Sequence, residues 1–367
     1  MTTYYVDTTV SGGLDNGSSW ANAWNDLQAA IDKPLAAGDV VLCYSNGDTN
    51  KESPGATIDF DGTSGSNSSG GYIKFIGCST NSGDGSPDGT KYVLDGGGIL
   101  SPLVYMTSDY LWIENFRFTN ASGDGVNTGG INANIWVWIN CIFDNNGDCG
   151  WSCSSNSSST HWFIGCQFYG NTGDGLEAIA ASAYYTFVNC VVYQNGGRGI
   201  DGIQSQNGIL SRCLIFDNGD SNINLAIAHY SIIDSCIIDG TNQSSENGIY
   251  LGGDLVYVFA TRITNSVNGI EATDNLGIVG WCLFDGNTND SGDATDTLLY
   301  HLPFQSDLDL TSNKGVFSEG NPAGSTNKFD PDMDDGYNAA SSQDYNLKAS
   351  RTYNSDGTDT VELGVGS

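Results

Sequence analysis

Two carboxylic side chains, placed alike in two successive repeats of a pattern, are the residues best suited to chemistry. Glu177 lies in the segment GLEAIA, and Asp201 lies 24 residues later in the segment GIDGIQ. In each segment an apolar residue precedes the acid, so a strand would point the apolar side chain inward and the acid outward. Adjacent carboxylates on a rigid sheet can act as a general acid and base, or they can bind a hard cation. Arg198, in the turn before Asp201, is the only basic residue near them.

The same residues also have a simpler interpretation. A pair of charges on an exposed sheet face is more often a solvated surface than an active site, and aspartates in Gly-rich turns most simply form the turn. A Ca²⁺ site that uses Asp148 and Asp174 is the sharper alternative, because Ca²⁺ prefers carboxylate oxygens. The recurring turn aspartates are Asp124, Asp148, Asp174 and Asp220.

A repeated segment determines where these side chains must lie. The segment Trp162–Asn171, WFIGCQFYGN, recurs along the chain with a cysteine at its centre. The first four steps between these cysteines are 25, 24, 23 and 23 residues. A fixed period of this length is typical of a solenoid, in which each repeat packs on its neighbours. The cysteines are Cys141, Cys166, Cys190, Cys213, Cys236 and Cys282.

The pattern inside each repeat predicts strands. Apolar and polar residues alternate, β-branched and aromatic residues are enriched, and no repeat contains a helical period of sufficient length. Turns rich in Gly, Asn and Asp separate the strands. Short strands stacked at ~4.8 Å form a parallel β-helix, so Glu177 and Asp201 would lie about 5 Å apart on neighbouring coils. Asn127, Tyr250 and Glu271 would lie in the same outward row.

Two columns of residues are predicted to be structural. The cysteine position points inward, so we expect a stack of small buried side chains kept as free thiols. An amide or hydroxyl residue follows each ladder position by five residues, which favours side-chain hydrogen bonds that lock the bend. The asparagines of this column are Asn146, Asn171, Asn195, Asn218 and Asn287. Cys149 and Cys153 lie outside the ladder; they can pair with each other, and they make a poor zinc site without further ligands nearby.

These features resemble the pectate-lyase-like superfamily of right-handed β-helix proteins. The opening, residues 4–44, is similar to that superfamily's usual strand, capping helix and first coil, and residues 359–367 are similar to its closing strand. The resemblance implies an all-β fold, a single-stranded right-handed parallel β-helix (solenoid) with an N-terminal capping helix and an irregular C-terminal cap. The implied regions are an N-terminal cap at 1–38, the β-helix at 39–300, and a C-terminal wrap and cap at 301–367.

The resemblance also places the active face of such proteins on the strand that follows the Gly-rich turn, which here carries Glu177 and Asp201. The superfamily's hydrolases carry paired aspartates with a Gly-His-Gly turn, and this sequence has none. Its lyases use a basic residue beside a Ca²⁺ cluster, for which only Arg198 is available. The histidines, expected in turns away from this row, are His161, His229 and His301.

Composition excludes several partners. The chain has 43 acidic and 12 basic residues, a net charge of −31, and the basic residues are scattered. Nucleic acid and anionic membranes need a basic surface, so neither is expected as a partner. A polyuronate would be repelled unless Ca²⁺ bridged it. No signal peptide and no apolar run long enough for a transmembrane helix is recognised in the sequence.

These observations favour a non-enzymatic structural or adhesive protein of a tailed phage, a decoration or receptor-binding subunit at the virion surface. The opening MTTYYVD…SSWANAW…AGD is similar to that of phage-encoded proteins. The expected partners are other virion proteins or a surface glycan, with a homo-oligomer possible. Outward aromatics among Trp112, Trp136, Trp151 and Trp162 can stack on sugar rings. The alternatives are a polysaccharide lyase or glycoside hydrolase at Glu177, Asp201 and Arg198, and a bacterial surface protein with an extracellular location.

Overall fold

The computed structural model describes most of residues 1–300. Outside the description lie residues 63, 67–70, 83–89, 130–134, 154–158, 179–183, 203–207, 226–229, 242–246, 253–255, 273–276, 281, 286, 292–297 and 301–367. The chain divides into two compact units, Met1–Gln206 and Asn207–Ser367. The predicted C-terminal wrap and cap lie outside the described residues. No described helix is long and apolar enough to span a lipid bilayer.

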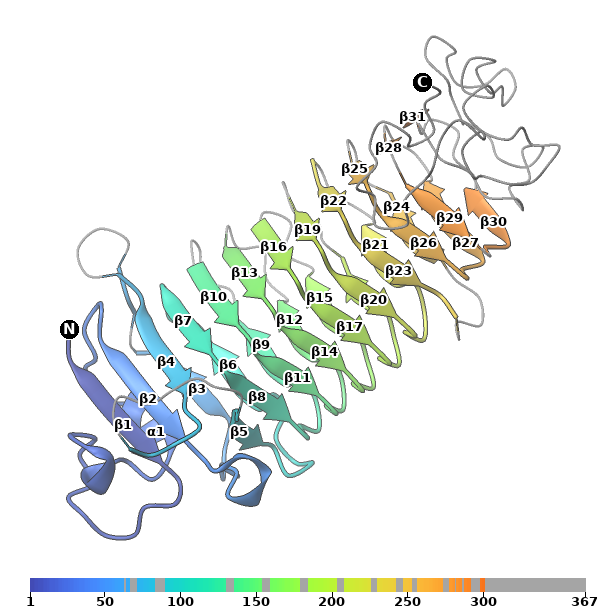
Figure 1. Ribbon diagram of the computed structural model, residues 1–367. Helices are drawn as coiled ribbons and strands as arrows, with labels where there is room; N and C mark the ends of the chain where they lie inside the picture. Colours follow the sequence, from blue (N-terminus) through green and yellow to red (C-terminus); the bar gives the residue numbers. More distant parts are fainter. Residues whose placement is uncertain are drawn as a thin grey trace, which may run out of the picture. The chain divides into compact units, whose positions relative to one another are not determined.

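The first unit is a parallel β-solenoid, in which the chain visits three sheets in turn (Figure 1). Its first sheet contains β1 (Thr3–Asp7), β2 (Val40–Tyr44), β4 (Ile73–Gly77), β7 (Leu111–Glu114), β10 (Ile135–Ile139), β13 (Thr160–Ile164) and β16 (Tyr184–Val188). Its second sheet contains β5 (Tyr92–Asp95), β8 (Phe116–Thr119), β11 (Ile142–Asp144), β14 (Gln167–Tyr169) and β17 (Val191–Tyr193). Its third sheet contains β3 (Ile58–Phe60), β6 (Val104–Met106), β9 (Val126–Thr128), β12 (Trp151–Cys153), β15 (Leu176–Ala178) and β18 (Ile200–Asp201).

The second unit has the same construction. Strands of the first kind are β19 (Ile209–Ser211), β22 (Ile232–Asp234), β25 (Val256–Phe259), β28 (Gly277–Gly280) and β31 (Leu298–Tyr300). Strands of the second kind are β20 (Leu214–Phe216), β23 (Ile237–Asp239), β26 (Arg262–Thr264) and β29 (Leu283–Asp285). Strands of the third kind are β21 (Ile223–Leu225), β24 (Asn247–Leu251), β27 (Asn268–Ala272) and β30 (Asn289–Ser291). The predicted all-β, parallel β-helix fold is therefore confirmed.

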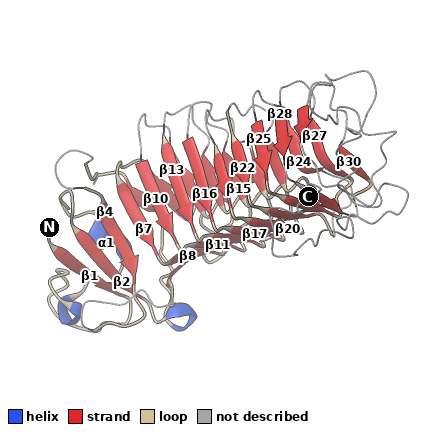
Figure 2. Cartoon of the chain, turned by 45° about the horizontal axis from the view of Figure 1, so that its top comes forward, coloured by secondary structure: helices blue, strands red, loops and turns tan. Residues whose placement is uncertain are grey.

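The described helices all belong to the N-terminal region (Figure 2). The predicted capping helix is α1 (Leu27–Ile31), and two short 3-10 turns, η1 (Trp20–Asn22) and η2 (Gly47–Thr49), accompany it. The Asp26 carboxylate accepts a hydrogen bond from the Ala29 N–H at 2.7 Å, which caps α1 at its first turn. Trp24 lies before α1 and forms a β-bridge with Val6.

The repeated segment contains two strands, where its pattern predicted one. In Trp162–Asn171 the chain runs through β13, turns at Gly165, and continues as β14. Gly165 has a φ of 64°, and the equivalent residues one coil away, Asn140 and Asn189, have φ values of 52° and 54°. A single left-handed residue is enough to bend the chain from one sheet to the next, and Asn and Gly tolerate that conformation best.

The cysteine ladder points inward, as predicted. All ten cysteines are buried as free thiols, including Cys149 and Cys153. The Cys190 Sγ donates to the Phe163 carbonyl at 3.3 Å, and the Cys141 Sγ donates to the Ile113 carbonyl at 3.5 Å, in each case in the preceding coil. Burial raises the pKa of Cys166 well above its ordinary value. The thiols therefore serve as small core residues that also bond the neighbouring backbone.

The asparagine column locks the next bend, which also confirms its predicted structural role. The Asn171 Nδ2 donates to the Asn195 Oδ1 at 2.9 Å and to the Phe143 carbonyl at 3.1 Å. The Asn146 Nδ2 donates to the Asn171 Oδ1 at 2.9 Å in the same way. Each amide therefore satisfies backbone and side-chain groups of its neighbours, so the column is buried without orphaned polar atoms.

Aromatic rings fill the interior beside these columns. The rings of Phe118, Phe143 and Phe168 stack on successive coils, with centroids 5.2 Å and 4.7 Å apart. A second column places the Phe163 ring 4.9 Å from the Phe187 ring. In-register parallel coils bring identical positions together, so each column repeats one kind of side chain.

Replacing Cys190 by Asp should destabilise the fold severely. The side chain is 1% exposed, so the new carboxylate would be buried between apolar coils without a partner. We expect a loss of more than about 3 kcal/mol in the free energy of unfolding, measured by urea denaturation. Cys190→Ala is the control, with an expected loss of about 1 kcal/mol. Equal losses in both variants would show that the position is not in a closed core.

Candidate functional site

The third sheet of the first unit brings the predicted acidic pair together. The strand register pairs Glu177 with Asp201 between β15 and β18. Upstream, Ser152 of β12 lies between Asn127 of β9 and Glu177, so these residues form one row across four strands. In the second unit, Tyr250 pairs with Glu271 as the sequence predicted. Ser152 was missed, although the alternation in its own strand places it in the row.

Asp174 and Arg198 complete the group around this pair. One carboxylate oxygen from each of Asp174, Glu177 and Asp201 lies within 4.8 Å of the others, which is close enough for one metal ion. Arg198 Nη1 lies 2.8 Å from Asp201 Oδ1 in an ion pair. We call Asp174, Glu177, Arg198 and Asp201 the acidic site. The predicted Ca²⁺ ligand Asp174 therefore lies beside the predicted catalytic pair.

Asp148 belongs to a second group one coil away. Ligand atoms of Asp124, Asp148 and Cys149 also lie within 4.8 Å of one another. Asp148 is exposed and Cys149 is buried, and burial raises the pKa of the Cys149 thiol well above its ordinary value. A protonated thiol is a poor ligand for Ca²⁺, which prefers oxygen. The two predicted Ca²⁺ candidates, Asp148 and Asp174, therefore do not share one cluster.

The turn aspartates also hold the coils together. The Asp174 Oδ1 accepts a hydrogen bond from the Arg198 backbone N–H at 2.6 Å, and the Asp124 Oδ1 accepts one from the Cys149 N–H at 3.2 Å. Each carboxylate thus reaches the turn of the following coil. A Cβ at Gly197 would lie 2.2 Å from the Asp174 Oδ1, so a side chain at this position would displace that carboxylate. Asp124 and Asp174 are therefore turn-forming residues whatever else they do.

The Glu177 carboxyl is perturbed by its surroundings in the acidic site. Burial, followed by the charges of Asp174, Asp124, Asp201 and Asp148, raises its pKa from 4.5 to about 7. A carboxyl that exchanges its proton near neutral pH can act as a general acid or base. The same repulsion can be relieved by a bound cation, since a metal ion favours the ionised form.

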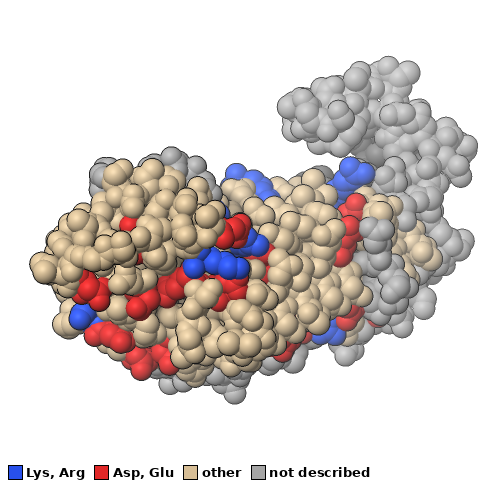
Figure 3. Space-filling model, turned by 90° about the horizontal axis from the view of Figure 1, so that it is seen from below, with Lys and Arg blue, Asp and Glu red and all other residues tan. Residues whose placement is uncertain are grey.

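Several basic residues of the first unit form ion pairs with carboxylates. Arg117 Nη2 lies 2.7 Å from the Asp144 Oδ2, and Lys51 forms an ion pair with Asp95. In the middle of the face shown in Figure 3, blue basic atoms lie directly against red acidic ones. Pairing of this kind leaves no extended basic stripe on that face.

One expectation about a single residue was wrong. His161 lies in β13 and is buried, where the sequence placed it in a turn; burial lowers its pKa to about 3. Its ring stacks 5.0 Å from the Tyr185 ring, in the core. Of the four tryptophans considered for sugar stacking, Trp136 and Trp151 lie in the core and are 1% and 0% exposed. When a strand carries apolar side chains on both faces, its sequence does not show which residues point into the core.

Several other expectations lie outside the described residues. They concern His229, His301 and most of the short connections 180–185 and 205–208 near the acidic site. Because these connections are short, the sequence predicts an open face over Glu177 and Asp201 without a substrate-sized pocket, and this stays a prediction.

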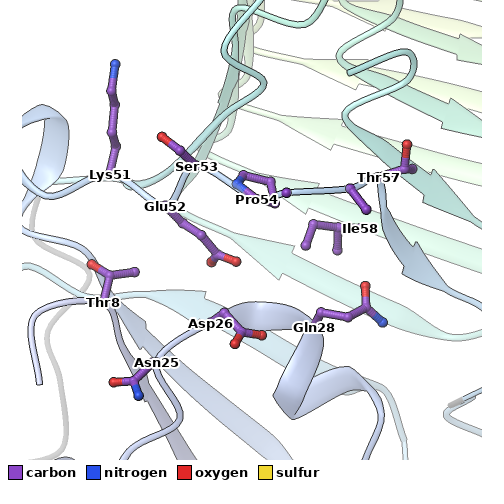
Figure 4. A pocket seen from close by; sticks show the side chains of 12 residues that line it. Thr8, Asn25, Asp26, Gln28, Lys51, Glu52, Ser53, Pro54, Thr57 and Ile58 are labelled. Atoms are coloured by element: carbon purple, nitrogen blue, oxygen red, sulfur yellow. The ribbon is translucent and has the colours of Figure 1, made fainter. Parts of the chain in front are cut away.

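A cavity of about 410 Å³ lies elsewhere in the first unit, between α1 and the segment 51–58 (Figure 4). Both carboxylate oxygens of Glu52 lie 3.1 Å from the Leu27 N–H, and the Tyr92 hydroxyl donates to the same carboxylate. Burial raises the pKa of Glu52 to about 7 against the lowering effect of these hydrogen bonds. Glu52 therefore joins the N-terminal cap to β5.

Wild-type protein should lose stability relative to Glu177→Gln as the pH rises. The pKa of Glu177 is raised in the folded state, so its favourable contribution is complete below about pH 4.5 and is lost as the pH passes 7. Urea denaturation at pH 5.5 and 8.5 measures the difference. Glu271→Gln, the same change in the row of the second unit, is the control. A constant difference between wild type and Glu177→Gln would contradict the assigned environment.

Glu52→Gln should also remove a pH dependence of stability. The shift from 4.5 to about 7 corresponds to about 3 kcal/mol of stability that wild type holds at low pH and loses above pH 7. Unfolding free energies measured from pH 5 to pH 9 should therefore fall more steeply for wild type than for Glu52→Gln. Glu114→Gln, a carboxyl of the first sheet, should follow the wild-type curve. Identical slopes for wild type and Glu52→Gln would refute the buried, protonated state.

Comparisons with known proteins agree on the fold. Residues 156–298 match the family model described as a right handed beta helix region. Pectate lyase Pel9A is similar with a TM-score of 0.54 and 18% identity, over 83% of this chain and 75% of that one. Tailspike protein 2 from Escherichia coli O157:H7 bacteriophage CAB120 is similar with a TM-score of 0.55 and 11% identity, over 82% of this chain and 42% of that one. The mannuronan C-5 epimerase AlgE6 A-module of Azotobacter vinelandii has a TM-score of 0.51 and 15% identity, over 82% and 88%. No curated protein matches the chain in sequence. The fold of this chain is therefore the right-handed parallel β-helix that these proteins share.

Proposed function

We propose that this chain is a non-enzymatic, adhesive or structural β-helix protein of a tailed-phage particle, and that it contacts surface polysaccharide. The virion surface is its proposed location, and other virion proteins or a glycan are its proposed partners. The state of Arg198 in the acidic site carries the proposal against the enzymatic alternative.

Arg198 is the only basic residue among the predicted site residues, and its side chain forms an ion pair with a carboxylate. Its guanidinium lies 2.8 Å from Asp201 Oδ1, and its backbone N–H is bound to Asp174. A neighbouring carboxylate stabilises the protonated guanidinium, which is the reverse of what a catalytic base needs. The ion pair also neutralises part of Asp201. This arrangement suits a structural tie between turn and strand.

Charge and fold likeness support the same proposal. A net charge of −31 keeps the protein soluble and disfavours acidic polymers as ligands. The fold is also that of a phage tailspike protein, of which this chain covers 42%. That likeness concerns the fold alone, and it shows that a protein of this fold can be part of a phage.

A second candidate function has an observation of its own. Glu177, with its pKa raised to about 7, lies beside Asp201, and a carboxyl that exchanges its proton near neutral pH beside a second carboxyl is the arrangement of a glycoside hydrolase. With Ca²⁺ held by Asp174, Glu177 and Asp201, the same group would instead suit a lyase that acts on an acidic polysaccharide. The fold is shared with a pectate lyase, so the fold cannot distinguish an enzyme from a non-enzymatic protein, and an activity measurement can.

An activity assay decides between the two candidates. Purified protein, with and without Ca²⁺, is incubated with acidic and neutral polysaccharides, and chain cleavage is followed by reducing ends and by absorbance of unsaturated products. We expect no cleavage. Cleavage that disappears in Glu177→Gln or Asp201→Asn, with the fold intact by circular dichroism, would establish the enzyme instead. Capsid and tail genes beside the coding gene would support the phage setting, and a polysaccharide-utilisation cluster would contradict it.

A further inference from the structure

We propose that the outer face of the first sheet in the first unit binds a neutral polysaccharide chain. This inference rests on the proposed function and adds a surface and a ligand class to it. The surface, here called the aromatic face, lies on a different sheet from the acidic site. It is made of the outward residues Trp112, Ile139, Trp162, Ile164, Tyr184 and Val188.

Strand register aligns the rings across neighbouring coils. Trp112 of β7 pairs with Val137 of β10, which pairs with Trp162 of β13. The two indoles are therefore two strands apart, about 10 Å, which is of the order of the length of a disaccharide. Tyr184 of β16 pairs with Thr160 of β13, two residues before Trp162. The two indoles therefore follow the stack of coils, and Tyr184 lies diagonally from Trp162 on the next strand.

These rings are exposed where aromatic side chains are normally buried. Trp162 is 46% exposed and Tyr184 is 40% exposed, although both project from a regular, hydrogen-bonded sheet. Ile139, Ile164 and Val188 pair with one another two residues beyond Trp162 along the strands, and they are half-buried, so they form an apolar row on that side of Trp162. Thr160 and Thr186 are the other outward residues next to Trp162 and Tyr184. Exposed aromatic groups beside an apolar row indicate a binding site.

Contacts on two sides hold Trp112 in place before any ligand arrives. Its Nε1 donates to the Glu114 Oε2 at 2.9 Å, and the Lys74 Nζ lies 4.6 Å from the centre of its ring. The Tyr72 ring packs 6.1 Å away in an edge arrangement. A ring fixed in this way loses little conformational freedom on binding, so more of the stacking energy contributes to affinity.

The charge of the face selects the ligand class. In the seven strands of this sheet, the charged residues are Lys74, Glu114 and Asp7, and Asp7 is buried. Lys74 and Glu114 balance each other, in a protein whose net charge is −31. Such a face offers no row of cations to a polyanion or a phosphate-rich surface. A neutral glycan, whose C–H faces stack on aromatic rings and whose hydroxyls stay in water, fits both the charge and the chemistry.

Affinity electrophoresis tests this inference with dextran, mannan, xylan and galactomannan as neutral probes and alginate and polygalacturonate as acidic ones. We expect at least one neutral probe to retard wild-type protein. Trp162→Ala and Tyr184→Ala should each weaken that retardation about tenfold, which is the loss of one aromatic stacking contact. Trp162→Phe should keep most of it. Tyr230→Ala, which removes a tyrosine that is 53% exposed in the second unit, is the matched control and should bind like wild type.

Four results would overturn the inference. Retardation that Trp162→Ala and Tyr184→Ala leave unchanged would place the glycan elsewhere and leave the proposed function standing. Retardation by the acidic probes alone would do the same. Binding to none of the six probes would count against both the inference and the proposed function. A wild-type oligomer that Trp162→Ala converts to monomers, measured by light scattering, would assign the face to a second copy of the chain. Circular dichroism and melting curves check that each variant is folded.

Discussion

Parallel hydrogen bonding between successive coils is the constraint on which the rest of this structure depends. Each strand pairs in register with the strand of the same kind one coil away, so a residue always lies beside its counterpart in the next repeat. Any side chain that is tolerated at one position must therefore be compatible with copies of itself. Cysteine, asparagine and aromatic residues meet this condition in three different ways, through small size, through paired amide groups and through stacked rings.

Parallel pairing in register also places equivalent residues side by side on the outer faces of the sheets, where the energetic result is different. Inside, repetition of like residues is favourable, whereas in the third sheet it brings carboxylates together at close range. The pKa of Glu177 is raised first by burial and then by the charges of the neighbouring carboxylates that this repetition brings close, and Arg198 forms an ion pair with one of them, Asp201. On the first sheet the repetition produces an apolar, aromatic surface instead. One architectural rule thus yields an acidic site on one face and the aromatic face on another.

The period of the sequence was sufficient to predict the fold and the pairing of Glu177 with Asp201, because a repeat of about 24 residues sets both coil length and register. The period could not show that each repeated segment contains two strands. The bend between them depends on one residue in the left-handed conformation, such as Asn140, and apolar and polar residues alternate both before and after it. The inward positions of His161 and Trp136 were missed for a related reason. In a strand with apolar residues on both faces, only the packed neighbours reveal which face is the core.

The contact between a turn aspartate and the glycine of the next coil has a consequence for how this sequence can change over time. A Cβ at Gly173 would lie 2.5 Å from the Asp148 Oδ1, and one at Gly197 would lie 2.2 Å from the Asp174 Oδ1. Neither glycine can acquire a side chain while the earlier aspartate keeps its place. The two positions are therefore expected to co-vary among descendants of this chain, although about one full coil of sequence separates them. An insertion or deletion preserves such Asp–Gly pairs only when it adds or removes a whole repeat. We therefore expect the length of the solenoid to change in steps of one coil.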